Sequence, residues 1–154
     1  MKVKLLSSGA IAPKRVNENA AGYDLFAPED IVINPGRNVV PMNFSVELDL
    51  NTEGTIRACS GNSVHGMKGY IADIGVEHRY DADVITGIVD CDYRGVVGVI
   101  IKSNESKPFL IKRGTKIAQM VVQRYICTPV EIVSELTETD RGTKGFGQLK
   151  HEKE

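Results

Sequence analysis

The stretch that most constrains this chain is Gly87-Ile88-Val89-Asp90-Cys91-Asp92-Tyr93-Arg94-Gly95. The apolar run 85–89 predicts a strand that ends on a carboxylate, and 96–101 predicts the next strand. An aspartate at a strand end is usually a turn former. Here an aromatic ring, a cation and a glycine follow it, which together suit a sugar ring, an anion and a closely approaching ligand. We therefore interpret the stretch as a binding or catalytic hairpin.

Length and composition indicate one ordinary globular domain. The 154 residues suffice for a real core, and 42% hydrophobic with 25% charged residues is typical. The net charge of −1 provides no global basic field for nucleic acid, so a polyanionic ligand requires local Arg and Lys clusters or a metal. The sequence has no apolar run long enough for a membrane span and no signal-peptide core at residues 1–6. We expect a cytoplasmic protein without membrane or direct nucleic-acid contacts.

The three cysteines are odd in number and widely spaced, which favours reduced thiols over a disulfide framework. A zinc site would have to combine Cys59, His65, His78 and Cys91. Their spacing matches no usual zinc motif, so we do not expect zinc.

The rest of the chain predicts a nearly all-β domain. Residues 44–50 alternate apolar and polar with period two, and turn signals recur about every ten residues, as in sandwiches and barrels. We expect one helical turn, within 63–68. Further strands are expected at 31–33, 39–40, 109–111, 117–126 and 130–133.

Two regions are predicted to lie outside the core. Residues 62–83 contain three glycines, two histidines and several charges, and residues 138–154 form a glycine-rich tail. Such a tail is usually disordered. Phe146 stands between two glycines, which suggests an arm that orders when the ring finds a partner.

Five short motifs occur in order along the chain. They are 20–25 (AAGYDL), 59–62 (CSGN), 87–95 (GIVDCDYRG), 113–119 (RGTKIAQ) and 141–147 (RGTKGFG). From about residue 2 to 147 this order resembles the trimeric dUTP pyrophosphatase (dUTPase) family, including its virus-encoded members. The resemblance implies a jelly-roll-like, distorted β-barrel domain over 1–137 that forms a homotrimer. It also implies that residues 138–154 form an arm exchanged between subunits, which closes a neighbouring active site.

The family hydrolyses dUTP to dUMP and pyrophosphate, which limits uracil incorporation into DNA and supplies dUMP. The resemblance implies that Asp90 is the base for the water that attacks the α-phosphorus, since a carboxylate suits this role. Asp24 matches a carboxylate that holds Mg²⁺, mainly through water. Tyr93 matches the ring that packs on the deoxyribose, and Phe146 the ring that stacks on uracil.

The resemblance also implies substrate contacts from main-chain and polar groups. Ser60 and Gly61 match a loop that meets the phosphate chain, and Gln119 matches an amide near the α-phosphate. Arg141 matches a γ-phosphate contact, for which a guanidinium is well suited. The remaining implied contacts are the backbone of Thr86, Gly87 and Ile88 with uracil, and Gly145 and Gly147 around the stacking ring.

The sequence departs from the family pattern in three places. Cys59 stands where the family usually has arginine, so one positive charge is missing. Arg57 lies two residues earlier, and period two would place it on the same face of a strand. If Arg57 compensates only partly, Cys59→Arg should raise kcat/KM. The tail also continues as 148–150 (QLK) in place of small hydroxyl residues.

The interval between Ser60 and Asp90 is longer than usual for the family by roughly a dozen residues. Surface loops tolerate insertions of this length. We place the insert within 64–84. As a polar loop it could carry a protein partner and be removed without loss of the chemistry.

Two other functions are compatible with a related fold. The chain could be a nucleotide-binding regulatory protein with weak or no turnover that acts through a protein partner, which Cys59 and the altered tail favour. It could instead resemble the dCTP deaminases, against which the 90–95 motif and Phe146 argue. If the chain is viral, the host cytoplasm or nucleus is its expected location.

Overall fold

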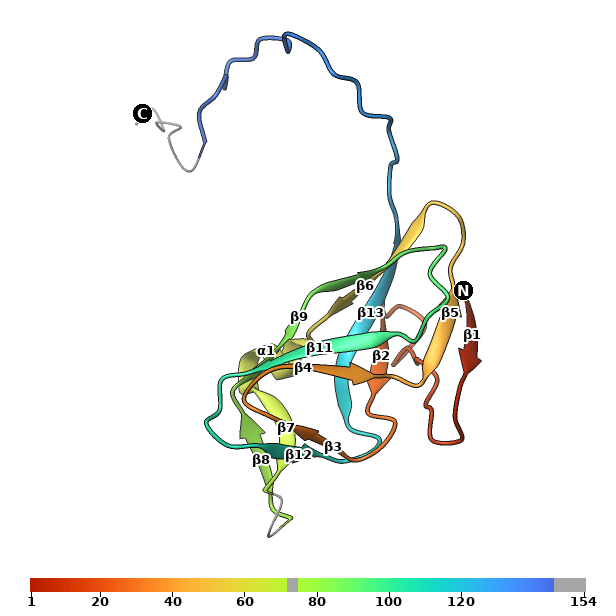
Figure 1. Cartoon of the computed structure of the whole chain (residues 1–154), viewed down its shortest axis with the longest axis vertical. Helices are drawn as coiled ribbons and strands as arrows, with labels where there is room; N and C mark the ends of the chain where they lie inside the picture. Colours follow the sequence, from red (N-terminus) through yellow and green to blue (C-terminus); the bar gives the residue numbers. More distant parts are fainter. Residues whose placement is uncertain (72–74, 146–154) are drawn as a thin grey trace.

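The structure, a computed structural model, describes residues 1–71 and 75–145. Strands dominate these residues, and the one helix among them is short (Figure 1). The elements are β1 (Lys2–Leu5), β2 (Gly22–Phe26), β3 (Ile31–Ile33), β4 (Gly36–Pro41), β5 (Phe44–Glu47), β6 (Thr52–Arg57), α1 (Ser60–His65), β7 (Met67–Tyr70), β8 (Glu77–Tyr80), β9 (Ala82–Ile85), β10 (Gly87–Val89), β11 (Gly98–Ser103), β12 (Phe109–Ile111) and β13 (Lys116–Arg124).

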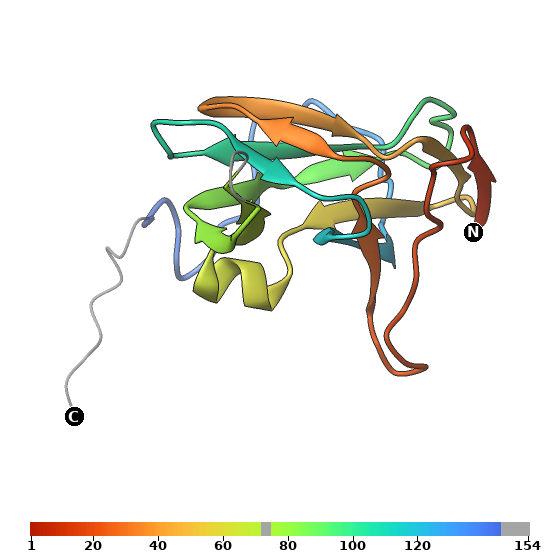
Figure 2. The same ribbon diagram turned by 90° about the horizontal axis from the view of Figure 1, so that it is seen from below.

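The strands form four antiparallel sheets that pack as layers (Figure 2). Their strand orders are β10-β6-β13-β2, β4-β11-β9, β3-β12-β7-β8 and β1-β5. This arrangement confirms the predicted all-β class. Among the described residues, no helix is both long and apolar enough to cross a membrane.

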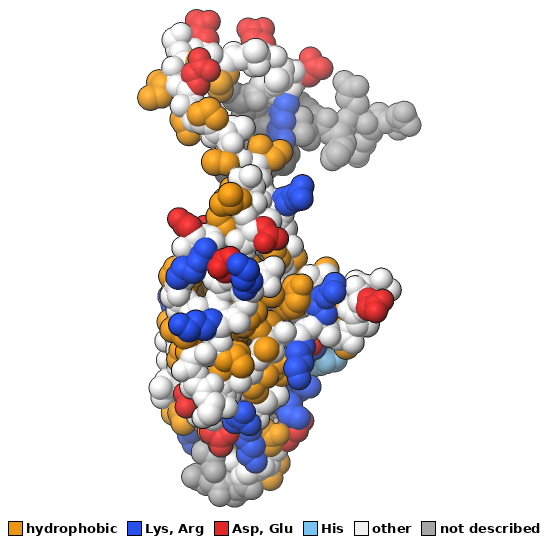
Figure 3. Space-filling model, turned by 90° about the vertical axis from the view of Figure 1, so that its right-hand side faces the viewer, with side chains coloured by type: hydrophobic (Ala, Val, Ile, Leu, Met, Phe, Trp, Pro, Cys, Tyr) orange, Lys and Arg blue, Asp and Glu red, His pale blue; other side chains and the backbone are white. Residues whose placement is uncertain are grey.

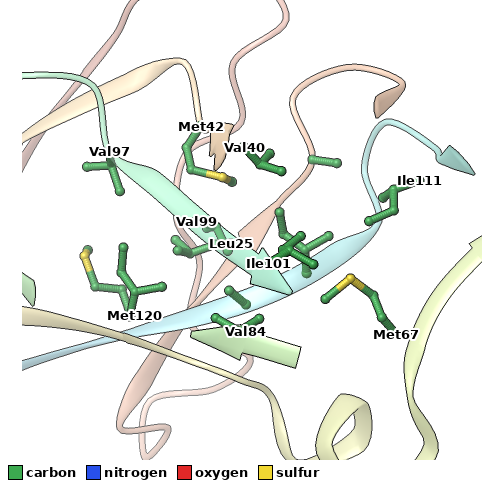
Figure 4. Close-up of a cluster of buried hydrophobic side chains, with 14 of the residues drawn as sticks. Leu25, Val40, Met42, Met67, Val84, Val97, Val99, Ile101, Ile111 and Met120 are labelled. Atoms are coloured by element: carbon green, nitrogen blue, oxygen red, sulfur yellow. The ribbon is translucent and has the colours of Figure 1, made fainter. Parts of the chain in front are cut away.

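The core lies between the β11 layer and the sheet that contains β13 and β2 (Figure 4). Val99 and Ile101 of β11 face Leu25 of β2 and Met120 of β13, and all four are fully buried. Burial alternates along β11, because successive side chains of a strand point to opposite faces. Each such side chain contributes about 1.5–3 kcal/mol on leaving water.

Several strands occur where the sequence predicts them, but the run 85–89 does not form one strand. β9 ends at Ile85 and pairs with β11, whereas β10 begins at Gly87 and pairs with β6. The chain therefore changes sheets at Thr86. Apolar residues lie on both sides of Thr86 and Gly87, so the sequence could be interpreted as one continuous strand.

The prediction of a strand at 130–133 is wrong. This segment has no strand pairing, and Val130 and Ile132 are almost fully exposed. Residues 126–145 follow β13 away from the body of the domain (Figure 1). Hydrophobic side chains are visible where the tail leaves the domain (Figure 3). An alternating apolar segment forms a strand only where another strand is available to pair with it.

The segment 64–84 is not the polar surface loop that the sequence suggested. It contains the end of α1 and the β7–β8 hairpin, and β7 pairs with β12. Met67 is fully buried, and the ring of Tyr80 stacks on that of Phe109 with centroids 4.1 Å apart. Gly69 leaves room for these rings, since a Cβ there would lie 2.6 Å from Phe109. The β7–β8 hairpin is therefore attached to the core through Met67 and Tyr80.

Removing residues 64–84 should consequently unfold the domain, contrary to the expectation from sequence. A sharper test is Met67→Ala, which should lower the free energy of unfolding by about 2–5 kcal/mol because it leaves a cavity in the core. Chemical denaturation would measure the change. Val64→Ala is the control within the same segment, because Val64 is exposed. Equal effects of the two substitutions would show that the hairpin is peripheral.

Candidate active site

A cavity of about 490 Å³ opens between β2, β13, α1 and β8. Four residues predicted from the sequence line it, namely Asp24, Ser60, Gly61 and Gln119. They come from three separate motifs, which the fold brings to one place. The other lining residues are Val16, Ala20, Ala21, Gly22, Cys59, Asn62, Arg79, Lys116 and Val121.

Gln119 is fixed in this cavity by its neighbours. It lies opposite Asp24 in the β13–β2 register, and its Nε2 donates a hydrogen bond to the carbonyl of Ala58 at 3.0 Å. The other side of the amide meets Gly22, where a Cβ would lie 2.7 Å from Oε1 of Gln119. The absence of a side chain at position 22 therefore allows the amide to lie over β2, and its orientation is set before any ligand binds.

Asp24 carries the only carboxylate among the described residues that line the cavity. Its Oδ2 lies 3.3 Å from Nζ of Lys116, and the Asp24 side chain is only 18% exposed. The sequence analysis missed Lys116 as a site residue, although it belongs to the motif at 113–119. A bulge in β13 between Lys116 and Ala118 shifts the register with β2 there.

Ser60 and Gly61 begin α1, so their N–H groups have no partner within the helix. Asn62 ties this helix to β13, because its Nδ2 donates to the carbonyl of Ile117 at 3.3 Å. Cys59, the residue before the helix, is buried, and this burial raises the pKa of its thiol. Position 59 therefore supplies no positive charge and keeps a neutral side chain at neutral pH.

Arg57 lies opposite Gln119 in the β6–β13 register, and its compensation for the missing charge stays a prediction. β6 ends at Arg57, so the alternation of faces does not extend to Cys59. Arg57 is exposed, Cys59 is buried, and Arg57 is not among the residues that line the cavity.

The turn at residues 90–95, called the Asp90 turn below, follows β10, the opposite edge strand of the sheet that contains β2. The prediction of a hairpin here is wrong, because β10 pairs with β6 whereas β11 pairs with β4 and β9. Asp90 is exposed, and its carbonyl accepts a hydrogen bond from the N–H of Tyr93 at 3.1 Å. The hydroxyl of Tyr93 donates to the carbonyl of Val96 at 3.2 Å, which holds the ring over Gly95. A Cβ at Gly95 would collide with this ring, so the glycine permits the conformation.

Arg94 stabilises the turn itself. Its Nη1 donates to the carbonyls of Cys91 and Tyr93, at 2.7 and 3.0 Å. The counter-charge for an anion that the sequence suggested stays a prediction.

β10 presents an open main-chain edge. It pairs with β6 on one side, and within the described part of the chain no strand pairs with its other side. A Cβ at Gly87 would meet nothing within 4 Å, and Ile88 is exposed. The backbone of Thr86, Gly87 and Ile88 is therefore accessible to a planar ligand with hydrogen-bonding edges.

The predicted site residues thus form two groups that one chain does not bring together. β10 and β2 are separated by two strands, and three spacings amount to about 14 Å. Asp90 and Tyr93 do not line the cavity that contains Asp24. Arg141 and Gly145 lie on the tail, where Nε of Arg141 donates to the carbonyl of Lys144. Phe146 and Gly147 lie outside the described residues.

The described residues contain no cluster of three side chains able to ligate a metal. Asp24 alone offers a carboxylate oxygen in the cavity. This donor set suits a cation that keeps most of its water and is shared with a phosphate ligand, which is the usual behaviour of Mg²⁺.

Comparison with known proteins identifies the family. Residues 8–149 match the sequence profile of the dUTPase family. The chain belongs to the dUTPase family. It is 36% identical over 148 residues to the deoxyuridine 5'-triphosphate nucleotidohydrolase of Clostridium tetani, covering 96% of this chain and 94% of that protein. The enzyme of the same name from Paramecium bursaria Chlorella virus 1 is 34% identical over 146 residues, with 94% of each chain covered.

Solved structures of phage dUTPases show the same fold. A variant of the Staphylococcus bacteriophage 80alpha dUTPase, with dUpNHpp, superposes with a TM-score of 0.78 at 26% identity and 96% coverage of both chains. A variant of the dUTPase from phage phi11 of S. aureus, whose structure reveals the coordination of a structural Mg(II) ion, has a TM-score of 0.72 at 24% identity. It covers 87% of this chain and 96% of the phage chain.

The environments of the cysteines predict an order of thiol reactivity. Because the thiolate is the reactive form, burial and a raised pKa should make Cys59 the last thiol to be alkylated. Cys127 is exposed and Cys91 partly so. Mass spectrometry after timed iodoacetamide treatment of the folded protein would give the order. Labelling of Cys59 as early as Cys127 would contradict its buried position beside α1.

Proposed function

We propose that this chain hydrolyses dUTP to dUMP and pyrophosphate. The observation that carries this proposal is the gathering of Asp24, Ser60, Gly61 and Gln119 around one cavity in a chain of the dUTPase family. The curated relatives named above are both nucleotidohydrolases. The regulatory and deaminase alternatives have no comparable support.

The cavity suits the phosphate chain of the substrate. The hydroxyl of Ser60 and the N–H groups at the start of α1 can donate to phosphate oxygens, and Lys116 adds a positive charge. Gln119, held by Ala58 and Gly22, would contact the α-phosphate. A rigid set of donors is effective because it costs no reorganisation when charge develops during the reaction.

The Asp90 turn would hold the nucleoside and the attacking water. Asp90 is exposed at the end of β10, where its carboxylate can accept a proton from water. The open edge at residues 86–88 would read uracil through main-chain groups, and Tyr93 would pack on the deoxyribose. The hydrogen bond from Tyr93 to Val96 keeps its ring beside the carboxylate-bearing turn.

Mg²⁺ is the cofactor that this donor set favours. Asp24 would hold the ion, largely through water, and the bound ion would neutralise part of the phosphate charge. Lys116 already lies beside Asp24, with its Nζ 3.3 Å from Oδ2 of that carboxylate.

A homotrimer would unite the two halves of the site. In one chain about 14 Å of sheet separates β10, which leads to the Asp90 turn, from β2, which carries Asp24, and this separation supports a second copy that supplies one half. The tail beyond β13 leaves the domain with apolar side chains uncovered by its own chain, as an exchanged arm would. In this arrangement the β domain spans 1–137, and the arm of 138–154 brings Arg141, Phe146 and the flanking glycines to a neighbouring site.

The role of Asp90 as base predicts that Asp90→Asn abolishes most turnover. The amide preserves the shape of the side chain but cannot take the proton, and loss of a general base typically costs about 10²–10⁴-fold. Release of pyrophosphate from dUTP would measure kcat, and titration with a non-hydrolysable analogue should show binding close to that of the wild type. Near-normal kcat in this variant would exclude Asp90 as the base.

Attack at the α-phosphorus predicts the destination of the solvent oxygen. In ¹⁸O-labelled water the label should appear in dUMP, because the new bond forms to the α-phosphorus. Mass spectrometry of both products would locate it. Label in pyrophosphate would mean attack at the β-phosphorus and a different arrangement of the site.

Sharing of the site between subunits predicts complementation between two inactive variants. Asp90→Asn and Asp24→Asn should each be nearly inactive alone. After co-refolding in equal amounts, roughly a quarter of the sites should combine an intact Asp90 with an intact Asp24 from different chains. Activity should then recover, and light scattering should give a trimer. A mixed trimer without recovered activity would place both residues in the site of a single chain.

A further inference from the structure

We propose that Arg79, on the β7–β8 hairpin, binds the β- and γ-phosphates of the substrate. This inference rests on the proposed hydrolysis of a nucleoside triphosphate and assigns a residue that no motif of the sequence contains. Arg79 belongs to the segment 64–84, which the sequence analysis treated as removable. The structure instead places this residue among those that line the cavity with Asp24, Ser60 and Gln119.

Arg79 is held in position by the helix that forms part of the cavity. Its Nη1 donates a hydrogen bond to the carbonyl of Gly66 at 3.1 Å, at the end of α1. Gly66 has a φ of 80°, and a Cβ there would lie 2.6 Å from the carbonyl oxygen of Tyr80. The end of α1 and the strand that carries Arg79 therefore touch. A guanidinium has five N–H donors, so this single bond leaves others for a ligand.

The charges around the cavity single out Arg79. Its described lining carries one acidic group, Asp24, and two basic ones, Lys116 and Arg79. Lys116 is paired with Asp24 at 3.3 Å, whereas the described salt bridges include none at Arg79. Cys59 is a neutral thiol. Arg79 is therefore the cation at this cavity whose charge is available to a polyanion.

The position of Arg79 along the cavity indicates which phosphates it meets. Asn62, Arg79 and Lys116 also line an adjoining hollow, whose other basic residues are Lys68, Lys112 and Arg113. Gln119, the candidate contact for the α-phosphate, lines only the first cavity. Arg79 thus lies where the first cavity meets the basic hollow, and it also lines a third hollow with Asp81 and Asp83. The phosphates distal to the sugar would extend toward the basic hollow. A guanidinium fork suits two phosphate oxygens better than a single ammonium does.

The test compares ligands that differ in their phosphates. Arg79→Ala should weaken binding of the imido analogue of dUTP by about 10–100-fold, the effect of losing a charge-assisted hydrogen bond. Binding of dUMP should change little, because dUMP lacks the β- and γ-phosphates. Arg79→Lys should recover part of the affinity for the analogue. Calorimetric titration of the intact protein gives both constants, and kcat/KM for dUTP should fall with the affinity for the analogue.

Arg37→Ala is the matched control, since Arg37 is an exposed arginine on β4 that lines none of these cavities. It should leave both affinities unchanged. If Arg79→Ala does not fold, Arg79→Gln replaces it, because glutamine keeps a polar side chain that can donate to Gly66.

Two outcomes would overturn the inference. An unchanged affinity for the analogue would show that Arg79 does not touch the phosphates. Equal weakening of dUMP and the analogue, together with a lower Tm, would show a purely structural role through Gly66. Failure of the proposed function is a separate result, since it would appear as a wild-type protein that does not hydrolyse dUTP.

Discussion

The backbone pairing of β13 with β2 on one side and β6 on the other positions most of the cavity. This ladder sets Gln119 opposite both Asp24 and Arg57, and the bulge near Lys116 allows its ammonium to reach Asp24. Because side chains alternate along a strand, a shift of one residue would turn Gln119 toward the core and Met120 toward the cavity. The buried Leu25, Met120 and Ile117 oppose such a shift. Core packing and cavity geometry therefore depend on one register.

The same sheet separates the two groups of candidate site residues within a single chain. Its two edges, β10 and β2, each present candidate site residues, and the intervening β6 and β13 have a partner strand on both sides. Edge strands have free main-chain groups, which suits β10 for recognition of a base but also leaves it open to association. An assembly that brings one edge of a chain to the opposite edge of another would use both features. The exposed apolar residues of the tail are consistent with this arrangement.

Sequence patterns predicted those elements that depend on local chemistry. β3 and β12 are short apolar runs bounded by turn residues, and they occur at the predicted positions. The motif residues Asp24, Ser60, Gly61 and Gln119 meet in one cavity because motif order reflects a shared topology. The change of sheet at Thr86 could not be predicted, since both flanking strands are apolar. Val130 and Ile132 were assigned to a strand because periodicity cannot show whether a partner strand exists.

The segment 64–84 was misinterpreted for a different physical reason. Many of its polar residues lie on the outer faces of β7 and β8. A few contacts, such as the buried Met67 and the Tyr80–Phe109 stack, attach the hairpin to the core. The proportion of polar residues in a segment does not show that a few of its side chains are buried in the core. Arg79 was overlooked for a related reason, because a motif search looks for a charge at a fixed place in the sequence. A bound phosphate interacts with the charges that lie near it in the folded protein, wherever they occur in the sequence. An anchored hairpin can therefore place an arginine at the cavity, while position 59 holds a neutral thiol.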